Sequence, residues 1–289
     1  MGNDPAAEEK LTNLAIKIQN NNFSDKPEYT KLTDQDILDP QHKIILSNIS
    51  QITKYSLVSP LEILYKQKFE KSKERDKCPI CLCEFYEDVL DIYEKNPSDV
   101  QFLMNIPFDV VLPEKCFDHF FHIECLNNLI GGKNYFKCPI CAKIYGVLIG
   151  DMPHGTFNAY KSPQRCTGFN CESIVINYSF PNGVGYTGTS RTSYLPNNKE
   201  GREVLALLKV AFDRKLTFTV GTSATTGRKN TVIWNGIHHK TSLFGGPTNF
   251  GYPDQTYFNR VKEELASKGV TQESIGRDLE SIAKEILRD

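Results

Sequence analysis

The sequence lacks any apolar run near the roughly 18 residues that a membrane-spanning helix needs. Its first residues, MGNDPAAEEKLTNLAIK, also lack the basic segment and long apolar core of a secretory signal, so we expect neither a membrane protein nor a secreted one. There is no excess of positive charge, because 34 Lys and Arg stand against 35 Asp and Glu. Proteins that coat nucleic acid usually have a basic surface. The composition therefore argues against a membrane or a nucleic acid as the main partner.

Cysteine is absent from residues 1–77 and 172–289, and seven of the nine cysteines lie between positions 78 and 141. An odd cysteine count without a signal sequence favours reduced thiols over disulfides. With two histidines, six of these cysteines form four pairs, each separated by two residues: Cys78 and Cys81, Cys116 and His119, His122 and Cys125, and Cys138 and Cys141. Zinc takes four thiolate or imidazole ligands in a tetrahedron. We therefore expect two structural Zn²⁺ ions with no open ligand position for catalysis.

The intervals between the pairs resemble those of a RING domain, whose ligand pairs interleave. The resemblance implies one site from the first and third pairs (Cys78, Cys81, His122, Cys125) and another from the second and fourth (Cys116, His119, Cys138, Cys141). Cys83 remains an alternative ligand to Cys81. A zinc-stapled fold without ligase activity and a nucleic-acid finger are alternative interpretations, although residues 126–137 contain only two lysines for holding phosphates.

A RING ubiquitin ligase binds a ubiquitin-charged conjugating enzyme on an apolar patch and orients its thioester for transfer. The resemblance places this patch at Ile80, Leu129 and Pro139. The alternative is that these three side chains only pack the core of the zinc domain. Many RING domains have a basic residue directly after the last zinc ligand, where this chain has Ala142 followed by Lys143. That departure favours a RING that serves only as a folding unit or a dimerisation surface.

The residues after the last ligand pair indicate a second domain with mixed strands and helices. β-Branched and aromatic residues predict strands, and apolar residues at helical spacing predict helices. Residues 173–180 and 215–220 are expected strands, and residues 217–235 are expected to form two strands joined by a loop. The expected helices are 202–214, 252–269 and 271–289. Asp254 is the expected N-cap of the second helix. We therefore expect an α+β domain over residues 145–289.

Gly183-x-Gly185-x-x-Gly188 matches the glycine pattern of a dinucleotide-binding loop and follows an expected strand. The residues after it are TSRTSYLPNN, which do not indicate a helix whose N-terminus would face a pyrophosphate. The dinucleotide-binding interpretation is therefore rejected.

Four phrases of the C-terminal segment, taken together and directly after a RING-like segment, resemble the Deltex family of ubiquitin ligases: YLPNN at 194–198, GTSATTG at 221–227, WNGIHHKT at 234–241 and GYPDQTY at 251–257. The resemblance covers residues 76 to about 270. It implies a C-terminal domain that binds ADP-ribose or NAD, and a ligase that directs ubiquitin onto ADP-ribosylated targets or ADP-ribose itself. The implied partners are a conjugating enzyme, ubiquitin, ADP-ribosylated proteins and ADP-ribosyltransferases, in the cytoplasm or nucleus, with a link to Notch signalling.

The resemblance also implies a ligand site made by a loop, an aromatic residue and the GYPD segment: Gly221, Thr222, Ser223, Trp234, His238, Phe250 and Tyr252. N–H groups and hydroxyls of the loop suit phosphate or ribose oxygens, and Trp234 offers a face for stacking. His238 exchanges protons near neutral pH, and with Glu264 it is expected to activate a ribose hydroxyl as a general base. Taken alone, the same residues fit an ordinary hairpin loop, a core aromatic, and a surface histidine and glutamate.

Two positions depart from much of the Deltex family. Phe250 stands where several members have histidine, and Ala224 stands where they have a second serine. Phe250 can stack but cannot relay a proton, so binding of ADP-ribose is better supported than ubiquitin transfer onto it. An aromatic residue at this position, with Gly245, Gly246 and Pro247 upstream, is similar to the Deltex-3 subgroup.

The expected organisation is an N-terminal segment over 1–75, a RING domain over 76–144 and the α+β domain over 145–289. The first segment begins with polar, asparagine-rich sequence, is expected to be partly helical or disordered, and has no assigned function. Its charged stretch from Lys66 to Lys77 mixes both signs, which indicates a solvated helix or linker. The leading hypothesis is a RING-type ubiquitin ligase. The alternatives are a non-enzymatic ADP-ribose reader and a zinc-dependent nucleic-acid binder.

Overall fold

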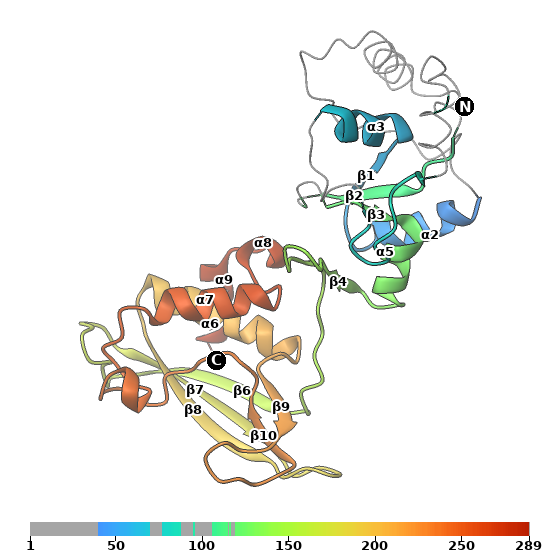
Figure 1. The fold of residues 1–289 in the computed structure, drawn as a ribbon. Coiled ribbons are helices and arrows are strands. Elements are labelled where there is room, and N and C mark those ends of the chain that lie inside the picture. The colour runs from blue at the N-terminus through green and yellow to red at the C-terminus, as the bar shows by residue number, and fades with distance from the viewer. Residues whose placement is uncertain are drawn as a thin grey trace. The chain divides into compact units, whose positions relative to one another are not determined.

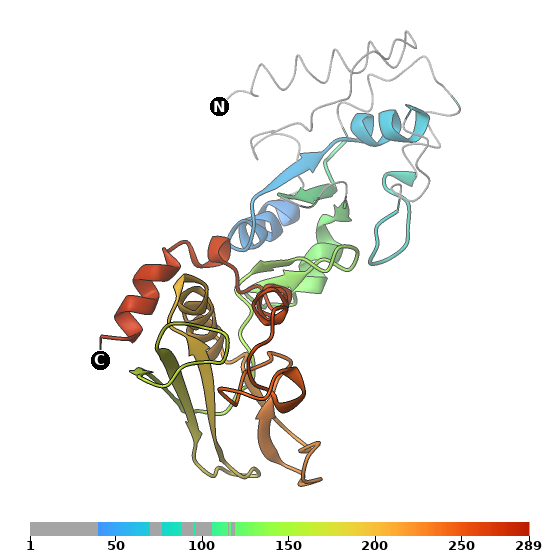
Figure 2. The ribbon, with the colours of Figure 1, turned by 90° about the vertical axis from the view of Figure 1, so that its left-hand side faces the viewer.

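The computed structural model describes residues 40–69, 77–87, 95, 106–114, 116 and 119–288. The chain divides into two compact units, Met1–Val147 and Leu148–Asp289 (Figures 1 and 2). Each unit has its own hydrophobic core. Within those described ranges no helix is both long and apolar enough to cross a membrane. The asparagine-rich start and most of the charged stretch, residues 1–39 and 70–76, lie outside the described residues.

The first unit combines a small antiparallel sheet, a separate hairpin and helices. Its strands are β1 (Tyr55–Val58), β2 (Val110–Pro113), β3 (Phe121–His122), β4 (Tyr135–Lys137) and β5 (Ile144–Gly146), and its helices include α2 (Pro40–Ser50), α3 (Pro60–Phe69) and α5 (Ile123–Ile130). The sheet has the order β1–β2–β3, and β4 pairs with β5. β1 pairs with β2 along its whole length, from Tyr55 opposite Pro113 to Val58 opposite Val110.

Helix α2 and strand β1 share one hydrophobic core with the expected RING residues. Ile49 and Leu57 are 0% and 3% exposed, and they lie in one cluster with Phe121 and Leu126. The described residues on either side of the boundary expected between residues 75 and 76 therefore share one hydrophobic core. From residue 40 onward, the segment that had no assigned function helps to build the first unit.

Helix α3 begins at a capping box that follows β1 directly. The Ser59 N–H donates to Glu62 Oε2 at 2.6 Å, and the Glu62 N–H donates to the Ser59 hydroxyl oxygen at 3.2 Å. Pro60 takes the first helical position, where no intrahelical donor is required. The sequence Ser-Pro-Leu-Glu therefore fixes where this helix starts.

The second unit places helices against an antiparallel sheet (Figure 1). Its strands are β6 (Thr156–Ser162), β7 (Ser173–Phe180), β8 (Thr189–Pro196), β9 (Phe218–Gly221) and β10 (Thr231–Trp234), and its helices are α6 (Lys199–Asp213), η3 (Pro247–Asn249), α7 (Tyr257–Ser267), α8 (Gln272–Ile275) and α9 (Leu279–Ile286). The sheet has the order β6–β7–β8, and β9 and β10 form a separate hairpin.

Helix α6 is the centre of the second core. Asn198 caps it by accepting the Gly201 N–H at 2.8 Å. Leu205 and Leu208 are fully buried, in one cluster with Ile176 of β7. α6 also contacts α7, α9 and β8. This packing holds β8, which lines part of the candidate ligand site, and α7, which carries Glu264.

The strand predictions for the second unit are largely confirmed. β7 covers residues 173–180, and the two strands predicted within 217–235 are the β9–β10 hairpin. A strand, β8, follows the glycine pattern that ends at Gly188, so the rejection of a dinucleotide-binding helix there is confirmed. β6 and β8 had no counterpart among the expected strands.

Two helix predictions need correction. The single helix expected over 271–289 is wrong, because Gly276 adopts a left-handed conformation, with φ of 67°, and ends α8 before α9 begins. Thr256, and not Asp254, is the N-cap of α7. The Asp254 carboxylate accepts the Thr256 N–H at 3.1 Å, so it lies just outside the helix and is available for other contacts.

Candidate functional site

The first group of metal-ligand side chains joins a turn near the start of the zinc-binding segment to the β3–α5 junction. One ligand atom from each member lies within 4.8 Å of all the others in the set Cys78, Cys81, His122 and Cys125. His122 Nδ1 is 3.4 Å from Cys81 Sγ and 3.8 Å from Cys125 Sγ. His122 is the last residue of β3, and Cys125 lies in the first turn of α5. The junction between this strand and this helix therefore brings the two ligands close together.

The second group is Cys116, His119, Cys138 and Cys141. Cys116 Sγ lies 3.1 Å from His119 Nδ1, 3.5 Å from Cys138 Sγ and 3.9 Å from Cys141 Sγ. Ligands of one tetrahedral zinc ion, with Zn–S near 2.3 Å and Zn–N near 2.0 Å, lie roughly 3.5–3.8 Å apart. The donor atoms and their spacing therefore fit Zn²⁺, and the two groups interleave as the RING resemblance implied.

Two turns of similar backbone geometry supply four of the ligands, at Cys78–Cys83 and at 138–143. In each, the first cysteine accepts the N–H four residues later, from Leu82 (2.8 Å) or Ala142 (2.9 Å). Leu82 and Ala142 have positive φ of 65° and 58°. Cys83 is exposed and stands outside the ligand group, with Sγ 3.7 Å from the Cys81 carbonyl oxygen. The geometry therefore favours Cys81 over Cys83 as the ligand.

The three residues expected to dock a conjugating enzyme differ in exposure. Ile80 and Leu129 are half-buried and pack partly against the core of the first unit, whereas Pro139 is exposed. Two further apolar side chains, in the turns at 78–83 and 138–143, are more exposed: Leu82 at 71% and Ile140 at 53%. Sequence reasoning missed both, although each stands beside a ligand cysteine.

The second unit contains a cavity of about 780 Å³. Its walls come from the β8 edge, the β9–β10 loop and the chain after β10: residues 190–192, 222–226, 233–234, 236–239, 241 and 250. The cavity thus brings together five of the predicted site residues: Thr222, Ser223, Trp234, His238 and Phe250.

Two predicted binding residues do not line the cavity. Tyr252 is 0% exposed, and its hydroxyl donates to the Tyr194 carbonyl oxygen at 3.0 Å, so it is a core residue. Gly221 ends β9 opposite Thr231, and a Cβ there would lie 2.7 Å from Ile233 Cδ1. Both residues therefore pack behind the walls of the cavity, and a direct contact of either one with a ligand stays a prediction.

Trp234, which was predicted to offer a face for stacking on the ligand, lies against other aromatic rings. Its ring stacks on Phe218, with centroids 4.3 Å apart, and on His239, with centroids 4.0 Å apart. The edge of Trp234 also meets Tyr178 at nearly a right angle. Trp234 therefore forms part of the rigid floor of the cavity, because other rings already cover its faces.

His239 belongs to this floor, and sequence reasoning did not assign it a role. It is buried, its Nε2 lies 2.8 Å from the Tyr178 hydroxyl, and its Nδ1 lies 2.9 Å from the Ile237 carbonyl oxygen. Burial lowers the pKa of His239 to about 4, so this imidazole is neutral at physiological pH. A neutral ring donates from Nδ1 and accepts from the tyrosine at Nε2.

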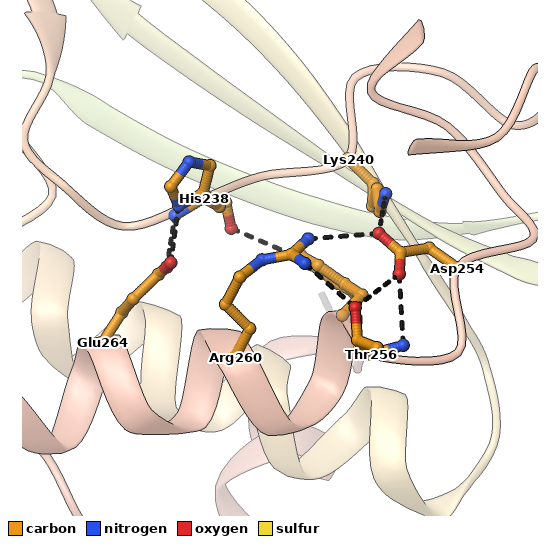
Figure 3. A network of polar contacts seen from close by, with 7 residues as sticks. His238, Lys240, Asp254, Thr256, Arg260 and Glu264 are labelled. Atoms are coloured by element: carbon orange, nitrogen blue, oxygen red, sulfur yellow. Dashed lines mark hydrogen bonds and ion pairs between the residues drawn. The ribbon is translucent and has the colours of Figure 1, made fainter. Parts of the chain in front are cut away.

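His238 and Glu264 form the predicted pair (Figure 3). Glu264, on α7, accepts the His238 backbone N–H at 2.7 Å with one oxygen and lies 2.5 Å from His238 Nδ1 with the other. The carboxylate is 18% exposed, whereas His238 is 61% exposed and lines the cavity. In the neutral ring, this arrangement assigns the proton to Nδ1 and leaves Nε2 as an acceptor.

A buried ion network fixes the chain next to His238 (Figure 3). Asp254 accepts from Lys240 at 2.6 Å and from Arg260 at 3.1 Å, and the Lys240 and Asp254 side chains are only 4% and 3% exposed. Burial acts to raise the pKa of Asp254, but hydrogen bonds from Lys240, Arg260 and Thr256 hold it below its usual range. Arg260 and Glu264 stand one turn apart on α7, so this helix holds both ends of residues 238–240.

Parts of this chain are similar in sequence to known proteins. Residues 149–270 match the Deltex C-terminal domain. The chain is 39% identical over 217 residues to the probable E3 ubiquitin-protein ligase DTX3 of Homo sapiens, which is 71% of this chain and 55% of that protein. It is 39% identical over 176 residues to the E3 ubiquitin-protein ligase DTX4 of Mus musculus (55% and 29%), and 36% identical over 229 residues to DTX1 of Mus musculus (72% and 35%). The chain thus spans about half the length of the DTX3 relative, and less of the others.

Proposed function

This chain belongs to the Deltex family, and from that membership we propose that it is a RING-type E3 ubiquitin-protein ligase that recruits ADP-ribose or ADP-ribosylated substrates. One observation carries the proposal: two closed Cys/His groups and a cavity with a His238–Glu264 pair occur in a single chain. The proposed partners are a charged conjugating enzyme, ubiquitin, ADP-ribosylated proteins and ADP-ribosyltransferases, in the cytoplasm or nucleus and with a link to Notch signalling.

The first unit would act by orientation rather than by covalent chemistry. Zinc, when bound, would hold the turns at 78–83 and 138–143 and the β3–α5 junction in place. Four protein ligands at each site would leave no position on the metal for substrate. Ile80, Leu129 and Pro139 would contact the conjugating enzyme, which restricts the motion of its ubiquitin thioester. The partial exposure of Ile80 and Leu129 and the exposure of Pro139 support this assignment.

A discharge assay tests the ligase proposal. The full chain should speed the release of ubiquitin from a charged conjugating enzyme, and Ile80→Ala should lose most of this stimulation while still holding two zinc ions. Ile44→Ala is the matched control, because Ile44 is 68% exposed on α2, away from the zinc ligands in sequence. Failure of the unaltered chain with a broad panel of conjugating enzymes would contradict the proposal.

The second unit would bind ADP-ribose in its 780 Å³ cavity. The volume suits a nucleotide-sized ligand, and His238 Nε2 would accept a proton from a ribose hydroxyl while Glu264 holds the ring. Calorimetry with ADP-ribose tests this directly, and His238→Ala should weaken binding. Absence of heat at millimolar ligand would remove the reader role, and unchanged binding by the variant would remove the assignment of His238.

A non-enzymatic ADP-ribose reader is the second candidate, favoured by one observation. Ala142 follows the last zinc ligand in a left-handed turn, where the RING resemblance implies a basic side chain in many members. The two candidates differ in one outcome: a non-enzymatic reader binds ADP-ribose but does not speed the release of ubiquitin from a charged conjugating enzyme. Ala142→Arg would then be expected to create stimulation where the unaltered chain shows none.

A further inference from the structure

Cys83 is an exposed cysteine of the first unit that lies outside both metal-ligand groups of the described residues. It follows Cys81, an exposed member of the first group, by two positions. A cysteine ligates zinc as a thiolate, and a thiolate is the form of cysteine that reacts with oxidants. A thiol without a metal therefore stands beside a ligand that is both exposed and reactive.

The turn at 138–143 shows that the fold does not require a cysteine at this position. The two turns begin with the same four residues, Cys-Pro-Ile-Cys. In the first turn, the Cys78 N–H donates to the Cys83 carbonyl oxygen at 2.9 Å. In the second, the Cys138 N–H donates in the same way to the Lys143 carbonyl oxygen at 2.9 Å. Lysine thus takes the place of Cys83 in a turn of the same geometry, and the backbone does not explain the thiol.

The Cys83 side chain lies against Cys81. Its Sγ donates to the Cys81 carbonyl oxygen at 3.7 Å. A hydrogen bond between the two side chains is also the first cause that raises the pKa of Cys83. Residues two positions apart have Cα atoms at most roughly 7 Å apart, and a disulfide needs about 4.4–6.8 Å. A disulfide between these two cysteines is therefore within reach of a small change in the turn.

We propose that Cys81 and Cys83 form a reversible oxidation site, through which hydrogen peroxide releases zinc from the first metal-ligand group. In the first step the Cys81 thiolate attacks a peroxide oxygen, the S–O bond forms, the O–O bond breaks and hydroxide leaves, which gives a sulfenic acid. In the second step the Cys83 sulfur attacks the Cys81 sulfur, and the S–S bond forms as the S–O bond breaks. The departing hydroxide takes the Cys83 proton and leaves as water. The two sulfurs lose two electrons, and the peroxide receives them.

Cys83 is available to resolve the sulfenic acid in a way that the other nearby sulfurs are not. Cys78 and Cys125 are themselves members of the first group, so in the zinc-loaded chain each is held by the metal when Cys81 is oxidised. Cys83 has no metal to leave. In the second group Lys143 takes the place of this thiol. Resolution to a disulfide should therefore be faster in the first group than in the second.

Oxidation removes one of the four donors of the first group. A disulfide sulfur has no thiolate charge, so Cys78, His122 and Cys125 are left to hold the metal, which weakens its binding. The same turn carries Ile80, a residue expected to contact the conjugating enzyme. The loss of zinc should therefore also disturb this contact. A dithiol reductant reverses the change, because exposed disulfides are readily reduced.

Oxidation of the zinc-loaded full chain with hydrogen peroxide tests the site. A chromogenic chelator records the zinc that is released, and mass spectrometry locates disulfides and sulfinic acids. The tryptic peptide after Lys77 contains three cysteines, and its fragmentation shows which two are joined. Early in the reaction the unaltered chain should release about one zinc ion per chain and join Cys81 to Cys83. A dithiol reductant with added zinc should restore both zinc content and free thiols.

Cys83→Ser and Cys83→Lys are the test variants. Serine is close to cysteine in size, and lysine is the residue of the other turn, so both variants should hold two zinc ions before oxidation. After the same treatment Cys81 should proceed to sulfinic acid, and zinc recovery on reduction should fall about fivefold. Cys171→Ser is the matched control, because Cys171 is a half-buried thiol of the second unit. It should release and recover zinc as the unaltered chain does.

Several results would overturn the site. Equal recovery of zinc by Cys83→Ser and the unaltered chain would show that Cys83 is not the resolving thiol. A disulfide of Cys81 with Cys78 or Cys125 in the unaltered chain would show the same. A Cys83→Ser chain that holds one zinc ion fewer before oxidation would make Cys83 a ligand instead. Zinc content and disulfide mapping do not depend on ubiquitin discharge, so a failure of the ligase proposal is distinguishable from a failure of this one.

Discussion

The position of one proton decides what His238 can do in the cavity. Glu264 engages both the backbone N–H and Nδ1 of His238, so the carboxylate fixes the tautomer as well as the ring orientation. The remaining nitrogen, Nε2, is then an acceptor on an exposed side chain. At the residue scale, Glu264 is therefore a positioning residue whose influence reaches the ligand only through His238.

Replacing Glu264 with Gln should disturb this tautomer. The amide cannot accept both hydrogen bonds, because its NH₂ group repels one donor, and we expect a loss of about 1–2 kcal/mol in the free energy of unfolding. Nitrogen chemical shifts of His238 should change from a single Nδ1-protonated form to a mixture, and ADP-ribose affinity should fall several-fold. Glu263→Gln is the control, since Glu263 is exposed on the same helix. An unchanged His238 spectrum in Glu264→Gln would show that the carboxylate does not set the tautomer.

Asp254 makes the stability of the second unit sensitive to acid. Its pKa is lower in the folded chain than the unfolded value of about 3.9. Its contribution is therefore complete above pH 4 and is lost as pH falls through the folded pKa. Asp254→Asn should cost about 3 kcal/mol near neutral pH, because Lys240 is left buried without a full counter-charge.

The cost of Asp254→Asn should shrink as the pH falls below 4. Trp234 is the only tryptophan of the chain and lies in the second unit, so its fluorescence follows unfolding of that unit at each pH. Asp151→Asn, at an exposed position, should show no such difference. A constant gap between Asp254→Asn and the unaltered chain from pH 7 to pH 2 would contradict the role of this carboxylate.

At the element scale, α2 and β1 belong to the unit that contains the two Cys/His groups. Ile49→Ala should destabilise that unit by about 2–5 kcal/mol, because it removes a fully buried side chain from the shared core. Zinc should then be released at a lower guanidinium concentration. Ile44→Ala, on the same helix but 68% exposed, should change release by less than about 0.5 kcal/mol. Equal release by both variants would mean that α2 is dispensable for the zinc sites.

Local sequence pattern predicted some elements and could not predict others. β7 was found because its side chains are β-branched, aromatic and almost continuously buried. β6 was missed because only Ala159 is buried along an edge strand, which leaves little alternation to detect. The pairing of β1 with β2 joins Tyr55 to Pro113, and such distant contacts leave no trace in either segment alone.

The same distinction separates the two candidate sites. The zinc groups could be predicted because each ligand pair is a local turn, and the RING resemblance supplied the interleaving. His239 was not assigned because its contacts with Tyr178 and Trp234 depend on how the hairpin packs against the sheet. The aromatic neighbours of Trp234 could not be predicted for a related reason: Phe218 and His239 lie against its ring only once the hairpin has folded onto the sheet.

At the scale of the whole molecule, all eight zinc ligands fall in one unit and the whole ligand cavity falls in the other. Removal of zinc with a strong chelator should therefore unfold the first unit and abolish ubiquitin discharge. The second unit has its own core of buried side chains without a ligand among them, so it should stay folded. Trp234 fluorescence and ADP-ribose affinity should both persist, and restored zinc should restore discharge. If the Trp234 transition instead followed zinc release, the two units would depend on each other for folding, and recognition of the substrate would be lost together with the ligase activity.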